Sequence, residues 1–171
     1  CKGIINFHPA PLPEYKGTSG YNLAILDSKT SWAVTAHYMN NDIDAGRIIE
    51  RKNFSIDLEY ETVASLEKKS MVKIEELALN IINKAIIQKS YLPSFKNEGG
   101  RYVSRLEMES LKEVGVGDDV DRKIRAFWYP PYNGAYIRID NKKYTLVNQK
   151  ILYDIAPTNI NAVFLDKEQD F

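Results

Sequence analysis

Residues 3–8 read Gly-Ile-Ile-Asn-Phe-His, an apolar, isoleucine-rich run that predicts a buried β-strand. Prolines at positions 9, 11 and 13 end this strand, because proline lacks an N–H and fixes φ. Downstream, the pattern predicts a helix over 21–26 and strands over 31–40 and 46–56. Because the chain has no initiator Met and opens directly in a strand, we expect further elements before residue 1.

The clearest predicted helix runs from Glu61 to about Lys89. Its apolar residues recur every three or four positions, which is the pattern of one buried face, and Lys and Glu occupy the opposite face. Strands that alternate with helices favour an α/β fold with a mostly parallel sheet.

The composition changes after Pro93, and we divide the chain into regions 1–95 and 96–171. In the second region, short helices are predicted over 106–114 and 120–127, followed by an aromatic- and proline-rich turn over 127–134. Strands over 135–139 and 143–147 are predicted to form a β-hairpin, and a further strand is predicted over 150–155.

Composition excludes several classes of protein. The 171 residues carry 23 basic and 23 acidic side chains, a balance that argues against a dedicated nucleic-acid or membrane-surface module. One cysteine excludes an internal disulfide framework and suits a reducing compartment, so we expect a cytoplasmic protein. Two separated histidines and one cysteine do not form a zinc-binding pattern, so no metal is expected.

Polar residues with catalytic potential gather around the first two predicted strands. Asn6 and His8 lie two residues apart and therefore share one face of the first strand. Histidine suits proton transfer near neutral pH, and asparagine can donate to an oxyanion, although a packed strand-end histidine is the alternative. Asp42 and Asp44 follow the second strand, where a carboxylate could orient His8 or serve as an ordinary turn residue. His37, within that strand, is either a satisfied buried histidine or a residue near the substrate.

Three blocks in this order resemble the folate-dependent formyltransferases. They are Asn-Phe-His-Pro-Ala-Pro-Leu-Pro-Glu-Tyr-Lys-Gly at 6–17, Val-Thr-Ala-His at 34–37 and Asp-Ala-Gly-Arg-Ile-Ile at 44–49. The resemblance implies that residues 1–95 are the C-terminal portion of a Rossmann-like catalytic core whose N-terminal half is absent. Region 96–171 would add short helices and a small C-terminal β-hairpin.

The resemblance also implies an activity: transfer of a formyl group from 10-formyltetrahydrofolate to a primary amine, without a metal. Asn6, His8 and Asp44 correspond to the catalytic residues, and Asp42 and Ile43 to the folate-binding positions. Asn6 and a protonated His8 would stabilise the tetrahedral oxyanion, and His8, oriented by Asp44, would carry the proton.

For the acceptor the resemblance is less specific, and it implies a nucleotide-linked amino sugar. Trp128, Tyr129 and Tyr132 are candidates to contact the base, and Arg101 and Arg105 to contact phosphate, since guanidinium groups match phosphate geometry. The alternative is an aromatic turn packed on the core, with solvated arginines.

Other readings stay open. Methionyl-tRNA formyltransferase is the second hypothesis, and it alone would require a nucleic-acid partner. A catalytically inactive, formyltransferase-like binding module is the third, and a hydrolase of formyl-folate is a further possibility. A homodimer through the C-terminal hairpin and no membrane partner are expected.

Overall fold

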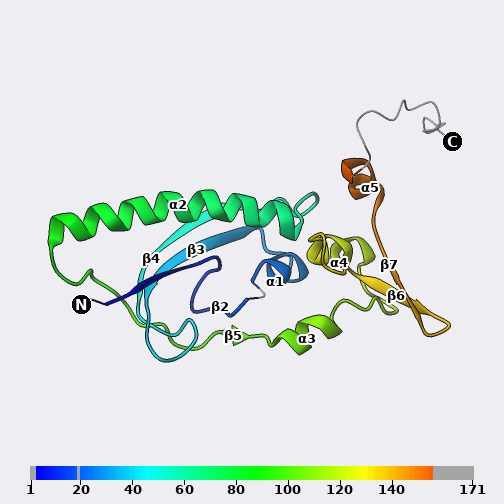
Figure 1. The fold of residues 1–171 in the computed structure, drawn as a ribbon, viewed down its shortest axis with the longest axis horizontal. Helices are drawn as coiled ribbons and strands as arrows, with labels where there is room; N and C mark the ends of the chain where they lie inside the picture. The colour runs from blue at the N-terminus through cyan, green and yellow to red at the C-terminus, as the bar shows by residue number, and fades with distance from the viewer. Residues whose placement is uncertain (1–2, 19, 156–171) are drawn as a thin grey trace.

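The computed structural model describes residues 3–18 and 20–155, which form an elongated molecule (Figure 1). The strands are β1 (Ile5–His8), β2 (Tyr15–Lys16), β3 (Ser31–Tyr38), β4 (Ile48–Ser55), β5 (Arg101–Tyr102), β6 (Tyr136–Ile139) and β7 (Lys142–Thr145). The helices are α1 (Gly20–Leu26), α2 (Val63–Gln88), α3 (Arg105–Ser110), α4 (Val120–Phe127) and α5 (Gln149–Ile155). The predicted α/β class is confirmed. The end of the predicted C-terminal region, 156–171, lies outside the described residues.

The main sheet has three strands in the order β1-β3-β4, and both pairings are antiparallel. A separate pair, β2 with β5, is parallel but only two residues long. The mostly parallel sheet predicted from the sequence is therefore not observed within 3–18 and 20–155. For β3 and β4 the cause is the connectivity, because a loop without a crossover helix joins them, and parallel neighbours need such a crossover.

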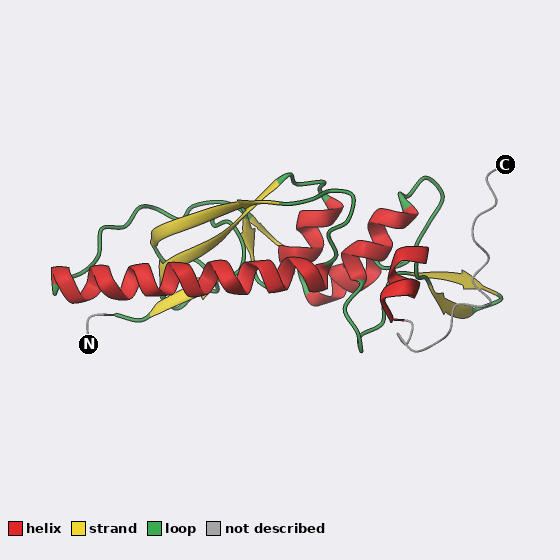
Figure 2. Ribbon diagram, turned by 90° about the horizontal axis from the view of Figure 1, so that it is seen from above, coloured by secondary structure: helices red, strands yellow, loops and turns green. Residues whose placement is uncertain are grey.

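Helix α2 lies along one face of this sheet (Figures 1 and 2). Thr62 and Ser65 form a capping box that satisfies two backbone N–H groups at its start. Leu77 on the buried face of α2 packs in one cluster with Val34 and Ala36 of β3. No helix in the described part of the chain combines the length and apolarity needed to cross a membrane.

The proline-rich loop after β1 is fastened to β3. The Trp32 indole N–H donates to the carbonyl oxygen of Pro9 at 2.9 Å. The Thr35 hydroxyl donates to the carbonyl oxygen of Ala10 at 2.8 Å and accepts from the Leu12 N–H at 3.1 Å. These buried contacts fix the path of the chain directly after His8.

The predicted C-terminal hairpin is confirmed as β6–β7. Its turn residues Asp140 and Asn141 have φ values of 48° and 63°, as in a type I′ turn, whose twist matches that of the flanking strands. The helix predicted over 106–114 is shorter, because the N–H of Val114 donates to the carbonyl oxygen of Tyr136 and joins that segment to β6.

The prediction of a strand over 150–155 is wrong, because this segment belongs to helix α5. The Asn148 side chain accepts from the Ile151 N–H at 2.9 Å, as a helix-capping residue does. Lys150 and Asp154 then lie one turn apart, with 3.7 Å between their charged atoms. The apolar residues of 150–155 suggested a strand, but the capping asparagine begins a helix.

Candidate functional site

Asn6 and His37 face each other across the β1–β3 pairing. The Asn6 Nδ2 atom lies 3.1 Å from His37 Nε2, and His37 Nδ1 lies 2.8 Å from the carbonyl oxygen of Tyr38. Because a carbonyl only accepts, the neutral His37 ring carries its proton on Nδ1, and Nε2 accepts from Asn6. Side chains alternate along β3, so this face is opposite to the one where Val34 contacts the α2 cluster.

Asp44 joins this cluster from the loop that follows β3. Its Oδ2 atom accepts from the Gly17 N–H at 2.9 Å and lies 3.4 Å from His8 Nδ1. Its Oδ1 atom lies 3.4 Å from Asn6 Nδ2 and 3.5 Å from His37 Nε2. The two hydrogens of the Asn6 amide can therefore serve His37 and Asp44 together.

His8 lies behind Asp44 and is only 4% exposed. Its Nε2 atom is 2.8 Å from the carbonyl oxygen of Tyr15, which places a proton on Nε2 and leaves Nδ1 facing Asp44. Burial lowers the pKa of His8, and this effect outweighs the Asp44 charge and the Tyr15 carbonyl, which both raise it. His8 is therefore mainly neutral near pH 7 and has an unprotonated Nδ1.

Asp44 is held as a carboxylate. Burial raises its pKa, but the contacts with His37 and the Gly17 N–H, together with the neighbouring His8, more than offset burial and hold the pKa of Asp44 below its usual value. An ionised carboxylate thus lies beside a neutral imidazole, an arrangement that can accept a proton and pass it on. Among the described residues, no group of three His, Cys, Asp or Glu side chains could hold a metal ion.

A cavity of about 300 Å³ opens beside this cluster. It is lined by Asn6, His37, Asp44 and the loop residues 39–43. Asp42 and Ile43, the positions for which the resemblance implies folate contact, therefore lie on the cavity wall. His8 is not on the wall, and its Nδ1 atom faces Asp44, which is.

Asn97 also belongs to this site, although no pattern in the sequence indicates it. Its Nδ2 atom donates to the carbonyl oxygens of Asp44 and Gly46, at 2.8 and 2.9 Å. A loop asparagine between Lys96 and Glu98 has no periodic pattern around it that would mark it as a site residue.

The aromatic candidates lie away from the cavity. Tyr129 donates from its hydroxyl to Glu67 of α2 at 2.6 Å and stacks on Tyr132, with 5.8 Å between ring centroids. Trp128 is half-buried against the larger core cluster. In Figure 1, α4, after which these residues come in the chain, lies beside α1, away from the loop between β3 and β4.

The arginine candidates are exposed, and one of them is paired. Arg101 lies 4.0 Å from the Asp27 carboxylate and 3.7 Å from that of Glu107. Arg105 begins α3 and is exposed. A phosphate at Arg101 would have to compete with two carboxylates.

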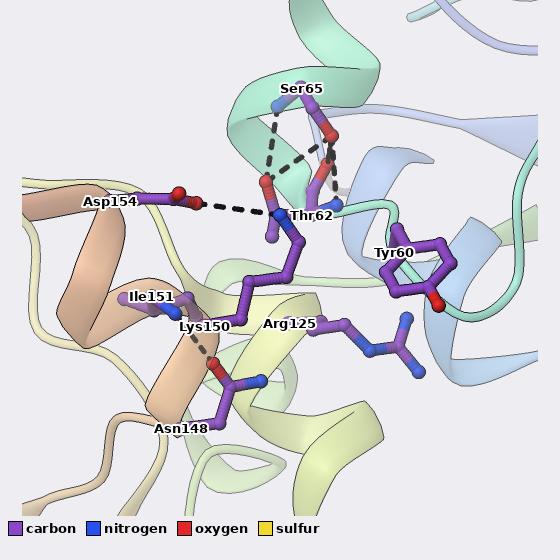
Figure 3. A pocket seen from close by; sticks show the side chains of 8 residues that line it. All are labelled: Tyr60, Thr62, Ser65, Arg125, Asn148, Lys150, Ile151 and Asp154. Carbon is purple, nitrogen blue, oxygen red and sulfur yellow. Dashed lines mark hydrogen bonds and ion pairs between the residues drawn. The ribbon is translucent and has the colours of Figure 1, made fainter. Parts of the chain in front are cut away.

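A second cavity, of about 100 Å³, lies where the start of α2, α4 and α5 meet (Figure 3). Its cationic residues are Arg125 and Lys150. The Arg125 guanidinium donates to the Asp121 carboxylate at 2.7 Å and to the carbonyl oxygen of Glu61 at 3.1 Å. Lys150 lies 3.7 Å from Asp154. Because each cation already faces a carboxylate, this cavity has no surplus positive charge for an anionic ligand.

Curated proteins of known name are similar to most of this chain. The chain is 28% identical over 150 residues to the GDP-perosamine N-formyltransferase of Brucella melitensis, a match that covers 84% of this chain and 55% of the relative. It is 30% identical over 146 residues to the methionyl-tRNA formyltransferase of Listeria monocytogenes, covering 84% of this chain and 46% of that protein. The chain thus spans about half the length of the curated relatives that it matches.

Solved structures agree with the fold. A 4-N formyltransferase from Francisella tularensis superposes with a TM-score of 0.74 at 23% identity, over 85% of this chain and 62% of that one. An N-formyltransferase from Helicobacter canadensis, solved with folinic acid and dTDP-3-aminofucose, gives a TM-score of 0.64 at 26% identity, over 82% and 52%. The family model described as formyl transferase matches residues 1–86, which include every residue of the cluster around Asp44 except Asn97. The chain therefore belongs to the formyl transferase family.

Proposed function

We propose that this chain carries the formyl-transfer site of a folate-dependent enzyme, which moves the formyl group of 10-formyltetrahydrofolate to the primary amine of a nucleotide-linked amino sugar. The observation that carries the proposal is the contact of Asp44 with Asn6, His37 and His8 at the wall of a cavity of about 300 Å³. An amide donor, a carboxylate and a neutral imidazole in contact are the groups that acyl transfer to an amine requires.

The chemistry proceeds in two stages. The amine nitrogen attacks the formyl carbon, a C–N bond forms, and the carbonyl electron pair moves to oxygen. Asn6 donates an N–H to this oxyanion, and the hydrogen now directed at Asp44 is the easier one to release, because that contact is the longer at 3.4 Å. Removing one such donor typically costs about 3–4 kcal/mol of transition-state stabilisation.

The proton of the attacking amine then has a defined route. Asp44 lies on the cavity wall and accepts it, while His8 Nδ1, 3.4 Å behind, receives the proton or stabilises it on the carboxyl group. When the bond between the formyl carbon and the folate nitrogen breaks, the same pair returns the proton to that nitrogen. In this mechanism His8 is a second base that receives the proton from Asp44 and contacts the substrate through Asp44.

The sugar-nucleotide acceptor is supported by the names of relatives and by the aromatic residues after α4. One relative is a GDP-perosamine N-formyltransferase, and one solved relative holds folinic acid and dTDP-3-aminofucose. We propose that Trp128, Tyr129 and Tyr132 contact the base, with Arg101 and Arg105 near phosphate. Because none of these residues lines the cavity beside Asp44, this role requires a ligand that extends beyond that cavity.

Methionyl-tRNA is the second candidate acceptor, supported by the similarity to the Listeria monocytogenes enzyme. The balanced charge, with 23 basic and 23 acidic residues, weighs against it, because tRNA binding normally uses a basic surface.

The test uses the full-length protein that contains this chain. It is incubated with 10-formyltetrahydrofolate and either a panel of dTDP-, GDP- and UDP-linked amino sugars or methionyl-tRNA, and products are identified by mass spectrometry. A formylated sugar nucleotide that is absent with Asp44→Asn supports the proposal. Formylated methionyl-tRNA alone would replace the acceptor but keep the chemistry. Folate binding without transfer to any acceptor would favour an inactive binding module, and release of formate without an acceptor would favour a hydrolase.

We also propose that the protein is a homodimer whose subunits meet at the β6–β7 hairpin. Among the described residues, the two strands pair with each other and, outside the hairpin, share a single bridge from Tyr136 to Glu113. Ile139, Tyr144 and Val147 are 51%, 48% and 41% exposed. A two-stranded hairpin is marginal without a partner surface. A monomer in light scattering at micromolar concentration would exclude the dimer. A cytoplasmic location stays a prediction that rests on the single cysteine.

A further inference from the structure

We propose that Asn97 is a positioning residue that holds Asp44 against His8 and Asn6 for catalysis. This inference rests on the proposed formyl transfer and adds a residue that lies beyond the segment matched by the family model. Asn97 does not line the cavity, so any effect that it has on the reaction must pass through the loop 44–46.

The Asn97 amide uses both of its hydrogens on this loop. Nδ2 donates to the carbonyl oxygen of Asp44 at 2.8 Å and to that of Gly46 at 2.9 Å, and Asn97 is 9% exposed. The orientation of the amide is unambiguous, because the reverse orientation would direct Oδ1 at two carbonyl oxygens. Asn97 Oδ1 has no hydrogen-bond partner among the described residues, so the two donated bonds alone account for this orientation.

The loop needs such a restraint because its backbone is not in a relaxed conformation. Asp44 has φ = 50°, in the left-handed region that residues other than glycine rarely occupy. Gly46 lies so close to β3 that a Cβ atom there would be 1.6 Å from the carbonyl oxygen of Tyr38. The turn is therefore fixed on one side by β3 and on the other by Asn97, and the Asp44 carboxylate projects from between these two restraints.

The backbone around Asn97 is fixed without the help of its side chain. Phe95 and Ile48 exchange two backbone hydrogen bonds, of 2.8 and 3.0 Å, which extend the edge of β4. Arg47 adds hydrogen bonds of 3.0 and 2.6 Å to Ser94. Changing the Asn97 side chain therefore removes the two bonds to the loop and leaves its own segment in place.

The variants Asn97→Ala and Asn97→Asp in the full-length protein test this role. The first removes both donors, and the second places carboxylate oxygens against two carbonyl oxygens. With either change, we expect kcat for formyl transfer to fall on the order of tenfold to a hundredfold, as for a displaced catalytic group, while folate affinity changes little. Glu98→Gln is the matched control, because it changes the residue next to Asn97, whose exposed carboxylate lies 3.2 Å from Lys96, and we expect wild-type kcat.

A second readout separates positioning from general destabilisation and does not need the reaction. The charge of Asp44 raises the pKa of His8 at 3.4 Å, so loosening Asp44 should lower that pKa further. Histidine NMR titration of wild type and Asn97→Ala, with the His8 signal assigned from His8→Gln, measures this shift. If a folded Asn97→Ala protein keeps the wild-type His8 titration and the wild-type kcat, the positioning role is wrong. If the His8 shift appears but the parent protein transfers no formyl group, the proposed function fails and the positioning of Asp44 stands.

Discussion

Asp44 Oδ2 lies 3.4 Å from His8 Nδ1, although His8 ends β1 and Asp44 follows β3, which runs in the opposite direction. In the β1–β3 register, Tyr38 at the end of β3 pairs with Ile5 at the start of β1, whereas His8 pairs with Thr35. Asp44 reaches His8 because the loop after β3 turns back over β1. The contact between Asp44 and His8 is therefore a product of the loop conformation and not of adjacent strand ends.

Asp44→Asn should reduce kcat strongly, because it keeps the shape of the side chain and removes its basicity. General-base catalysis typically contributes about 10²–10⁴-fold, and we expect a loss in that range with little change in folate affinity. Steady-state kinetics of the full-length protein, with folate binding measured separately, checks this. Asp140→Asn in the hairpin turn is the control, since asparagine also tolerates φ = 48°. Equal rates for Asp44→Asn and Asp140→Asn would contradict the role of Asp44.

The lowered pKa of His8 predicts how stability depends on pH. Because the folded pKa lies below the ordinary value of 6.5, the unfolded chain binds a proton here more readily than the folded protein does. Neutral His8 stabilises the folded protein fully above pH 6.5. This stabilisation is lost as the pH falls from 6.5 through the pKa that His8 has in the folded protein. Asp44, with its pKa below 3.8, adds a further loss at more acidic pH.

Thermal unfolding between about pH 7 and pH 5 measures the contribution of His8. We expect Tm to fall across this interval in the wild type and to fall less in His8→Gln, which cannot titrate. A wild-type slope in His8→Gln would mean that other groups account for the acid sensitivity.

Part of this site was predictable from the sequence, and the reason is periodicity. The spacing of Asn6 and His8 fixes them on one face of any extended strand, and the structure places both in contact with Asp44. The long helix was predictable because its buried face repeats over many turns, and α2 extends from Val63 to Gln88.

The remainder depended on contacts between distant segments. Asn97 binds a loop 53 positions earlier in the chain, and nothing in its neighbours indicates that contact. The direction of the sheet depends on the loop joining β3 to β4, and strand patterns do not reveal pairing direction. At 150–155 the missed signal was local: the Asn148 side chain accepts from the Ile151 N–H and begins a helix, whereas the apolar residues alone suggested a strand.

His37 should affect both stability and catalysis through its hydrogen bond with Asn6. His37 is 2% exposed and accepts from the Asn6 amide at 3.1 Å, so His37→Leu leaves a half-buried Asn6 N–H without its partner. We expect the free energy of unfolding to fall by about 1–3 kcal/mol, with a lower kcat because the amide is free to turn. His37→Gln, which retains an acceptor, should lose less of both. Chemical denaturation and kinetics on the two variants check this, and equal losses would show that only the volume of the side chain matters.

Tyr132 provides the sharpest test of the proposed nucleotide contact. It is 67% exposed and stacks on Tyr129, whose hydroxyl is held by Glu67, so its ring offers an accessible face next to a fixed partner. Stacking of a base on an aromatic side chain is worth about 1–3 kcal/mol, and Tyr132→Ala should therefore raise KM for the sugar nucleotide on the order of tenfold with folate affinity unchanged. Trp128→Ala should act in the same direction, but its half-buried ring also contributes to packing, so its stability must be measured as well.

The control for Tyr132→Ala is Tyr153→Ala in α5, where a tyrosine 50% exposed is removed from a surface with no proposed ligand. If Tyr132→Ala and Tyr153→Ala both bind sugar nucleotide and folate as the wild type does, the aromatic residues after α4 serve only packing. The nucleotide would then have to bind nearer to the cavity beside Asp44, where the ring-free wall of residues 39–43 offers amide, carboxylate and aliphatic groups in place of stacking.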